Sequence, residues 1–128
     1  MGDLTKNFSR SEFACHCGCG EDRISLVLVD ILQKVRNVLG RPIQINSGVR
    51  CAFHNKGEGG SEDSEHVPGG GVTGVGEGVD IKCTTSNDRY LLVSALFLIG
   101  VQRIGVAGEF VHCGIRAVKD KEVFWLYP

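Results

Sequence analysis

The chain has 128 residues, of which 14 are Lys or Arg and 15 are Asp or Glu, so its formal net charge is −1. Apolar residues make up 42% and charged residues 23%, a globular composition that excludes a disordered, collagen-like or nucleic-acid-coating chain. This length predicts a single domain over residues 1–128, and no apolar run is long enough to span a membrane. The N-terminal residues also lack the apolar core of a secretory signal peptide.

Glycine is the unusual feature of the composition. The chain has 18 glycines, and nine of them lie between Gly57 and Gly78. The same segment, extended to Asp80, carries six acidic residues and no Lys or Arg. We therefore predict a Gly-rich acidic loop over residues 57–79 that is flexible and set in a mildly basic body.

Hydrophobic periodicity predicts a first helix and a strand after it. Residues 24–39 carry apolar side chains at the spacing of one helical face, and Gly40 with Pro42 supplies the stop. Residues 43–46 then alternate apolar and polar side chains, as a half-buried strand does.

The second half of the chain predicts one more helix and four more strands. Residues 79–82 form a strand candidate that is entered from the Gly-rich loop. The helix should start with Ser86 or Asn87 as its N-cap and end at Gly100, and its apolar character predicts deep burial. Three short strands are expected at 103–107, 110–115 and 122–126. The predicted fold class is α+β, with a mainly antiparallel sheet covered by two main helices.

Two histidines and an aspartate offer a set of zinc ligands at the sheet. His66 lies in the acidic loop, whereas Asp80 and His112 lie on predicted strands. Two imidazoles and one carboxylate leave zinc an open position, as hydrolytic sites require. Glu109, three residues before His112, is a candidate general base. By residue type alone, such histidines are also typical of polar groups that are simply satisfied by hydrogen bonds.

Five motifs occur in an order that is much more specific than any one of them. The order resembles the zinc D-alanyl-D-alanine peptidase family, which includes VanX-type dipeptidases, VanY-type carboxypeptidases and phage endolysins on a hedgehog-like fold. The segment from Phe8 to Gly20 is also similar to the opening of one branch of that family. The motifs are Ser47-Gly48-Val49-Arg50-Cys51, His54-Asn55 with Gly59-Gly60, Ser64-Glu65-His66, Gly76-Glu77-Gly78-Val79-Asp80-Ile81 and Glu109-Phe110-Val111-His112.

The resemblance implies a role for each matching residue. One zinc ion would be held by His66, Asp80 and His112, with Glu109 as the general base. Arg50 would be catalytic at the scissile carbonyl or would bind a substrate carboxylate, because a guanidinium stays charged and offers paired donors. Ser64 would also contact the substrate.

The activity that the resemblance implies is hydrolysis of peptidoglycan stem peptides at or next to a D-amino acid. The enzyme would be a D-Ala-D-Ala carboxypeptidase or an endolysin-type endopeptidase, and we expect it to act as a monomer. The lack of a signal peptide is consistent with a phage or prophage lysin that stays in the cytoplasm until its release to the cell wall, or with a cytosolic dipeptidase.

Two positions depart from the family pattern. Gly76 comes ten residues after His66 where the family has three, which predicts a bulging loop that either leaves the ligands in place or loosens the site. Gly114 stands where the family commonly has an aspartate two residues after the last histidine. Loss of a carboxylate that orients a ligand can cost about 10–100-fold in metal affinity or activity.

Several other interpretations stay open from the sequence. The main competitor is a non-catalytic zinc-binding interaction module on the same fold, against which the presence of Glu109 argues. Cys15, Cys17 and Cys19 could bind a metal, but structural zinc sites favour two intervening residues and need a fourth ligand. Disulfides with Cys51, Cys83 or Cys113 are an equally good interpretation. A cysteine peptidase fits less well, because His112 and Cys113 point to opposite faces of a strand, and a calcium site in the acidic loop matches no established ligand spacing. A nucleotide-binding glycine loop also fits less well, because the glycines lead into a strand and no Lys-Ser/Thr follows them.

Overall fold

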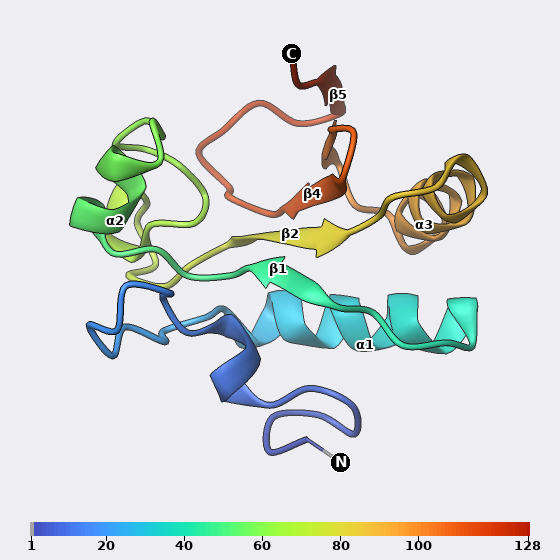
Figure 1. Ribbon diagram of the computed structural model, residues 1–128, viewed down its shortest axis with the longest axis horizontal. Helices are drawn as coiled ribbons and strands as arrows, with labels where there is room; N and C mark the ends of the chain where they lie inside the picture. Colours follow the sequence, from blue (N-terminus) through green and yellow to red (C-terminus); the bar gives the residue numbers. More distant parts are fainter. Residues whose placement is uncertain (1) are drawn as a thin grey trace.

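The computed structural model of the protein describes residues 2–128, and its helices and strands follow the predicted order (Figure 1). The helical elements and strands are η1 (Arg10–Phe13), α1 (Leu26–Leu39), β1 (Ile45–Ser47), α2 (Ala52–Gly57), η2 (Pro68–Gly70), β2 (Gly78–Lys82), α3 (Ser86–Ile99), β3 (Arg103–Val106), β4 (Phe110–Gly114) and β5 (Val123–Leu126). The short helix α2 was not predicted.

The strands form one sheet in the order β1-β2-β4-β3-β5. Every neighbouring pair is antiparallel except β3 and β5, which run parallel. Helices α1 and α3 pack against each other, and Figure 1 shows α2 at the opposite end of β2 from α3. The α+β class with a mainly antiparallel sheet is therefore confirmed. Among the described residues, no helix is both long and apolar enough to cross a membrane.

Both long helices have the caps that their sequences favour. Ser25 caps α1 by accepting a hydrogen bond from the backbone N–H of Leu28, and Gly40 ends that helix in the left-handed region. Thr85 is the N-cap of α3, one residue before the predicted start, because its hydroxyl accepts the backbone N–H of Asp88.

The prediction that α3 is deeply buried is wrong. Only one face of α3 packs against the core, through Leu92, Ala95 and Leu96. Tyr90 is 72% exposed and Leu98 is 74% exposed. The apolar composition of this segment predicted more burial than the structure shows, because its apolar residues are not gathered on one face of the helix.

The two faces of the sheet have different chemistry because side chains alternate along each strand. Val79 and Ile81 of β2 and Val111 and Cys113 of β4 point into the hydrophobic core. The residues between them, including Asp80 and His112, therefore share the other face. This alternation separates the core from a polar face that can hold a functional site.

The Gly-rich segment is less loose than its composition predicts. Gly57 belongs to α2 and Gly78 already belongs to β2, so the connecting segment is shorter than 57–79. Glu58, Glu62 and Asp63 are exposed, but Glu65 and Glu77 are buried. The prediction of a flexible solvated loop is wrong at these two carboxylates, because each has a buried partner.

Arg116 is the partner that holds the segment together. It is 1% exposed, and its Nε donates to Glu77 Oε1 at 2.8 Å. Its guanidinium also donates to backbone carbonyls on both sides of the bulge, including that of Val67 at 2.8 Å and that of Val75 at 3.4 Å. Gly71 allows the close approach, since a Cβ there would lie 2.7 Å from Arg116 Nε.

Candidate metal centre

His66, Asp80 and His112 converge at the polar face of the sheet. Asp80 on β2 and His112 on β4 are directly paired across the antiparallel ladder, and His66 reaches them from the Gly-rich segment. One side-chain donor atom of each residue lies within 4.8 Å of the others, and all three residues are buried. Since His66 Nε2 lies 3.3 Å from Asp80 Oδ1, the residues inserted before Gly76 bulge out without separating these groups.

The spacing of the donors fits a zinc ion. Zinc bonds of about 2.0–2.1 Å to nitrogen and oxygen place tetrahedral ligands about 3.3 Å apart. Asp80 Oδ1 lies 3.3 Å from His66 Nε2 and 2.9 Å from His112 Nδ1. Two imidazoles and one carboxylate are also a donor set that zinc prefers, and it leaves a fourth position for water or substrate.

Each imidazole is oriented through its other nitrogen. His66 Nδ1 lies 2.6 Å from the carbonyl oxygen of Gly48, which can only accept, so this nitrogen carries the proton and Nε2 is left as the metal donor. His112 Nε2 lies 2.9 Å from Glu65 Oε1, so it donates to that carboxylate and leaves Nδ1 facing Asp80. Such hydrogen bonds fix the tautomer and the ring orientation of metal-binding histidines.

Glu65 fills the place left open by the missing aspartate of the family pattern. A Cβ built on Gly114 would lie only 2.1 Å from both carboxylate oxygens of Glu65, so the two side chains cannot coexist without a shift. Glu65 also accepts the backbone N–H of Arg116 at 3.0 Å and pairs with Arg103 Nε at 3.0 Å. The carboxylate expected to be absent is therefore supplied from position 65.

The charges of the group depend on one another. Burial would raise the pKa of Asp80, but hydrogen bonds with His112 and His66 outweigh burial and hold that pKa well below its ordinary value. Burial likewise opposes ionisation of Glu65, yet His112, the Arg116 backbone and Arg103 lower its pKa. Burial disfavours a charged His112, but Asp80 and Glu65 raise its pKa. A proton on His112 therefore competes with a metal ion for the same cluster.

Arg50 lies beside the metal donors and is held by neighbouring polar groups. Its Nη2 is 3.4 Å from Asp80 Oδ2, the oxygen that does not face both histidines. Its Nε donates to Ser47 at 3.2 Å, and its Nη1 donates to Asn55 Oδ1 at 3.3 Å. The sequence did not predict the role of Asn55, which is 2% exposed and also donates to the Ser61 carbonyl.

A cavity of about 540 Å³ opens over the three donors. Ser64 lines it, although the Ser64 hydroxyl also accepts the backbone N–H of His66 at 3.3 Å. Trp125 and Tyr127, which the sequence did not mark, line it as well, and Arg103 stacks 5.1 Å from the centre of the Trp125 ring. Tyr and Trp side chains combine an apolar ring with a polar tip, a chemistry suited to a peptide substrate.

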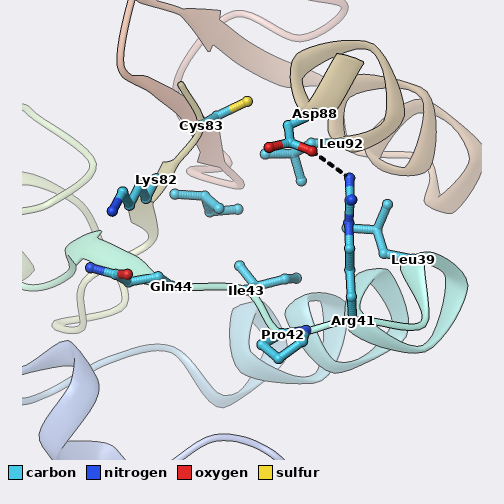
Figure 2. Close-up of a pocket in the computed structure, with 10 residues that line it drawn as sticks. Leu39, Arg41, Pro42, Ile43, Gln44, Lys82, Cys83, Asp88 and Leu92 are labelled. Carbon is cyan, nitrogen blue, oxygen red and sulfur yellow. Dashed lines mark hydrogen bonds and ion pairs between the residues drawn. The ribbon is translucent and has the colours of Figure 1, made fainter. Parts of the chain in front are cut away.

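A second cavity of about 180 Å³ lies away from these donors (Figure 2). It is lined by the end of α1, the residues that follow it, the end of β2 with Cys83, and the first half of α3. Its carboxylate, Asp88, is already paired with Arg41 at 2.8 Å, as the dashed line in Figure 2 marks. The metal-donor chemistry therefore belongs to the larger cavity.

The structure does not bring Glu109 to the metal donors. Glu109 is exposed, lies in the turn before β4 and does not line the cavity. Phe110 and His112 do line it, and alternation gives Glu109 the register of Val111, which faces the core. The spacing of three residues between Glu109 and His112 therefore suggested a general base, but the strand geometry places the Glu109 side chain away from the cavity. Glu109 therefore does not distinguish an enzyme from a binding module.

Comparison with known families agrees with this geometry. The family described as Peptidase M15 matches residues 6–114, which is most of the chain and includes all three metal donors. The chain belongs to the peptidase M15 family. This family is zinc-dependent, and membership supports a peptidase that acts on a peptide substrate. A search among curated proteins finds no significant match. The match to the M15 family confirms the resemblance to zinc D-alanyl-D-alanine peptidases.

Proposed function

We propose that this M15 peptidase hydrolyses peptidoglycan stem peptides at or next to a D-amino acid. The observation that carries the proposal is the convergence of His66, Asp80 and His112 at the floor of a cavity in a chain of a zinc peptidase family. The D-amino acid preference is supported by the five motifs that resemble D-alanyl-D-alanine peptidases. Zinc, when bound, supplies a Lewis acid for the scissile carbonyl and makes a water molecule more acidic.

The protein's own residues hold the metal donors in one arrangement. The Gly48 carbonyl keeps the proton of His66 on Nδ1, and Glu65 keeps the proton of His112 on Nε2. The lone pairs of the opposite nitrogens then face Asp80 and the metal position. Because these hydrogen bonds exist before a metal binds, little reorganisation is needed to form the centre.

Positive groups around the cavity suit a substrate with a carboxylate. Arg50, Arg103 and Lys119 line the cavity, and stem peptides end in a carboxylate. Arg50 is fixed by Ser47 and Asn55 beside Asp80, so we assign to it the binding of a substrate carboxylate or of developing oxyanion charge. Ser64 also lines the cavity and offers its hydroxyl to a peptide there, whereas its backbone carbonyl accepts from Arg116.

The test is digestion of purified peptidoglycan and of synthetic stem peptides by the zinc-loaded protein, with products identified by mass spectrometry. Peptides ending in D-Ala-D-Ala and in L-Ala-L-Ala serve as a matched pair. Release of terminal D-Ala indicates a carboxypeptidase, and cleavage inside the stem indicates an endopeptidase. Equal cleavage of both stereoisomers would contradict the D-amino acid preference. If no peptide is cut while zinc is fully bound, the non-catalytic zinc module is the better account.

A further inference from the structure

Four of the six cysteines form a cluster that the proposed peptidase chemistry does not use. Cys15, Cys17 and Cys19 lie in the loop between η1 and α1, and Cys51 is the N-cap of α2. Their sulfur atoms all lie within 4.8 Å of one another, and all six cysteines of the chain carry free thiols. Cys51 thus brings a fourth thiol to the three of the N-terminal motif.

The sulfur separations match those of a tetrahedral metal site. Zinc–sulfur bonds of about 2.3 Å place four thiolates about 3.8 Å apart. Cys17 Sγ lies 3.5 Å from Cys15 Sγ and 3.6 Å from Cys51 Sγ. Cys17 Sγ is therefore close to two other sulfur atoms at the same time, whereas a disulfide bond joins only two.

Backbone amides point at the sulfur atoms, as thiolate ligands require. The N–H of Cys51 donates to Cys15 Sγ at 3.4 Å, that of Glu21 to Cys19 Sγ at 3.5 Å and that of His54 to Cys51 Sγ at 3.3 Å. Such donors stabilise negative charge on sulfur.

The backbone explains how three cysteines at alternate positions can converge. In an extended strand, residues at this spacing point to the same side but lie about 6.6 Å apart along the chain. Gly18 and Gly20 adopt positive φ angles of 83° and 85°, a region that favours glycine. Gly18 lies between Cys17 and Cys19, and the chain turns back far enough for the Cys15 N–H to donate to the Glu21 carbonyl at 2.8 Å, so the usual two-residue spacer is not needed.

We propose that Cys15, Cys17, Cys19 and Cys51 bind a second zinc ion in a closed structural site. Four thiolates suit zinc, and they leave no open position for substrate. The site would tie the N-terminal loop to the residue that follows Arg50. The same region is already joined by the hydrogen bond from Val49 N–H to the Phe13 carbonyl at 2.8 Å. Because Arg50 lines the cavity, the second ion would stabilise the position of this part of the cavity lining.

The test is the zinc content of the reduced full-length protein, which we expect to be two ions per chain. The double variant Cys17→Ser/Cys19→Ser should hold one ion, and it is suitable because both side chains are exposed and outside the core. Cys83→Ser is the matched control and should still hold two. The variant His66→Ala/His112→Ala should keep one ion, so failure of the proposed peptidase site and of the cysteine site can be told apart.

Cobalt substitution identifies the ligands independently of folding effects in the variants. Cobalt in the cysteine site should give thiolate-to-metal charge-transfer absorption in the wild type and in His66→Ala/His112→Ala, but not in Cys17→Ser/Cys19→Ser. A single zinc ion in the reduced wild type that is lost in His66→Ala/His112→Ala, or cobalt binding without charge-transfer absorption, would overturn the proposal.

Discussion

The carboxylate of Glu65 occupies the space that a side chain at position 114 would need, and it accepts a hydrogen bond from His112 Nε2. Family members commonly place an aspartate at the position of Gly114. Here the loop supplies the carboxylate instead of the strand, and glycine in the strand makes room for it. The carboxylate at position 65 therefore requires a glycine at position 114.

Substitutions at Glu65 and Gly114 should show that the two positions depend on each other. Gly114→Asp alone should destabilise the fold by about 1–3 kcal/mol, because its side chain collides with that of Glu65. The double variant Glu65→Ser/Gly114→Asp should recover stability and zinc affinity relative to Gly114→Asp. Urea unfolding and zinc titration measure the two quantities. Additive effects of the two substitutions would show that the positions are not coupled.

Glu65→Gln should weaken zinc binding at the histidine site by about 10–100-fold, because an amide orients His112 less well than a carboxylate. Glu109→Gln is the matched comparison, since Glu109 is exposed and does not line the cavity. That variant should keep both zinc affinity and peptide hydrolysis. A large loss of hydrolysis in Glu109→Gln alone would return the general-base role to Glu109.

The pH dependence of the metal-free protein should have two limbs. The raised pKa of His112 adds stability that is complete below its ordinary value of 6.5 and is lost as pH rises through the raised value. The lowered pKa values of Asp80 and Glu65 add stability above their ordinary values of 3.8 and 4.5, which is lost as pH falls. Thermal unfolding of the metal-free protein should therefore show greatest stability between about 4.5 and 6.5.

Zinc binding should show the opposite trend on the alkaline side. Because the metal needs neutral His112, zinc affinity should increase as pH rises through the raised pKa of that residue. Zinc titrations at several pH values, made on the Cys17→Ser/Cys19→Ser variant, isolate the histidine site. Zinc affinity that stays constant across this range would contradict the proposed competition.

Arg116→Met should destabilise the protein by about 3–5 kcal/mol, because it leaves Glu77 buried without its partner and releases the carbonyls of the Gly-rich segment. Adding Glu77→Gln to that variant should recover part of the loss by removing the unpaired charge. Arg23→Met, which breaks the ion pair of the exposed Arg23 with the half-buried Glu21, is a control and should have only a small effect on urea unfolding, below about 1 kcal/mol.

The sequence predicted the elements well where periodicity and caps agree. Residues 24–39 and 86–99 have helical spacing with a left-handed glycine after each, and the structure confirms both helices. The strands at 79–82, 103–107, 110–115 and 122–126 are confirmed to within one residue at each end. Local pattern could not predict α2, which has six residues, or how little of α3 is covered, because both depend on tertiary packing.

The convergence of His66, Asp80 and His112 could be predicted because their motifs are short and ordered. The residues around them could not, since their partners lie far away in the sequence. Glu65 meets His112 across 47 positions, and Arg116 meets Glu77 across 39. Glu109 shows the opposite error, because closeness in sequence to His112 does not place it on the same face of β4. Cys51 joins the N-terminal cysteines across more than thirty residues, which spacing rules cannot reveal.

The central claim is that the group of His66, Asp80 and His112 makes this protein a zinc-dependent peptidase. The most direct measurement is hydrolysis of a D-Ala-D-Ala stem peptide by protein stripped with a chelator and then reloaded with zinc, beside Asp80→Asn treated identically. The account predicts that zinc restores hydrolysis in the wild type and not in Asp80→Asn. Equal hydrolysis by both proteins, or by the stripped wild type, would contradict it.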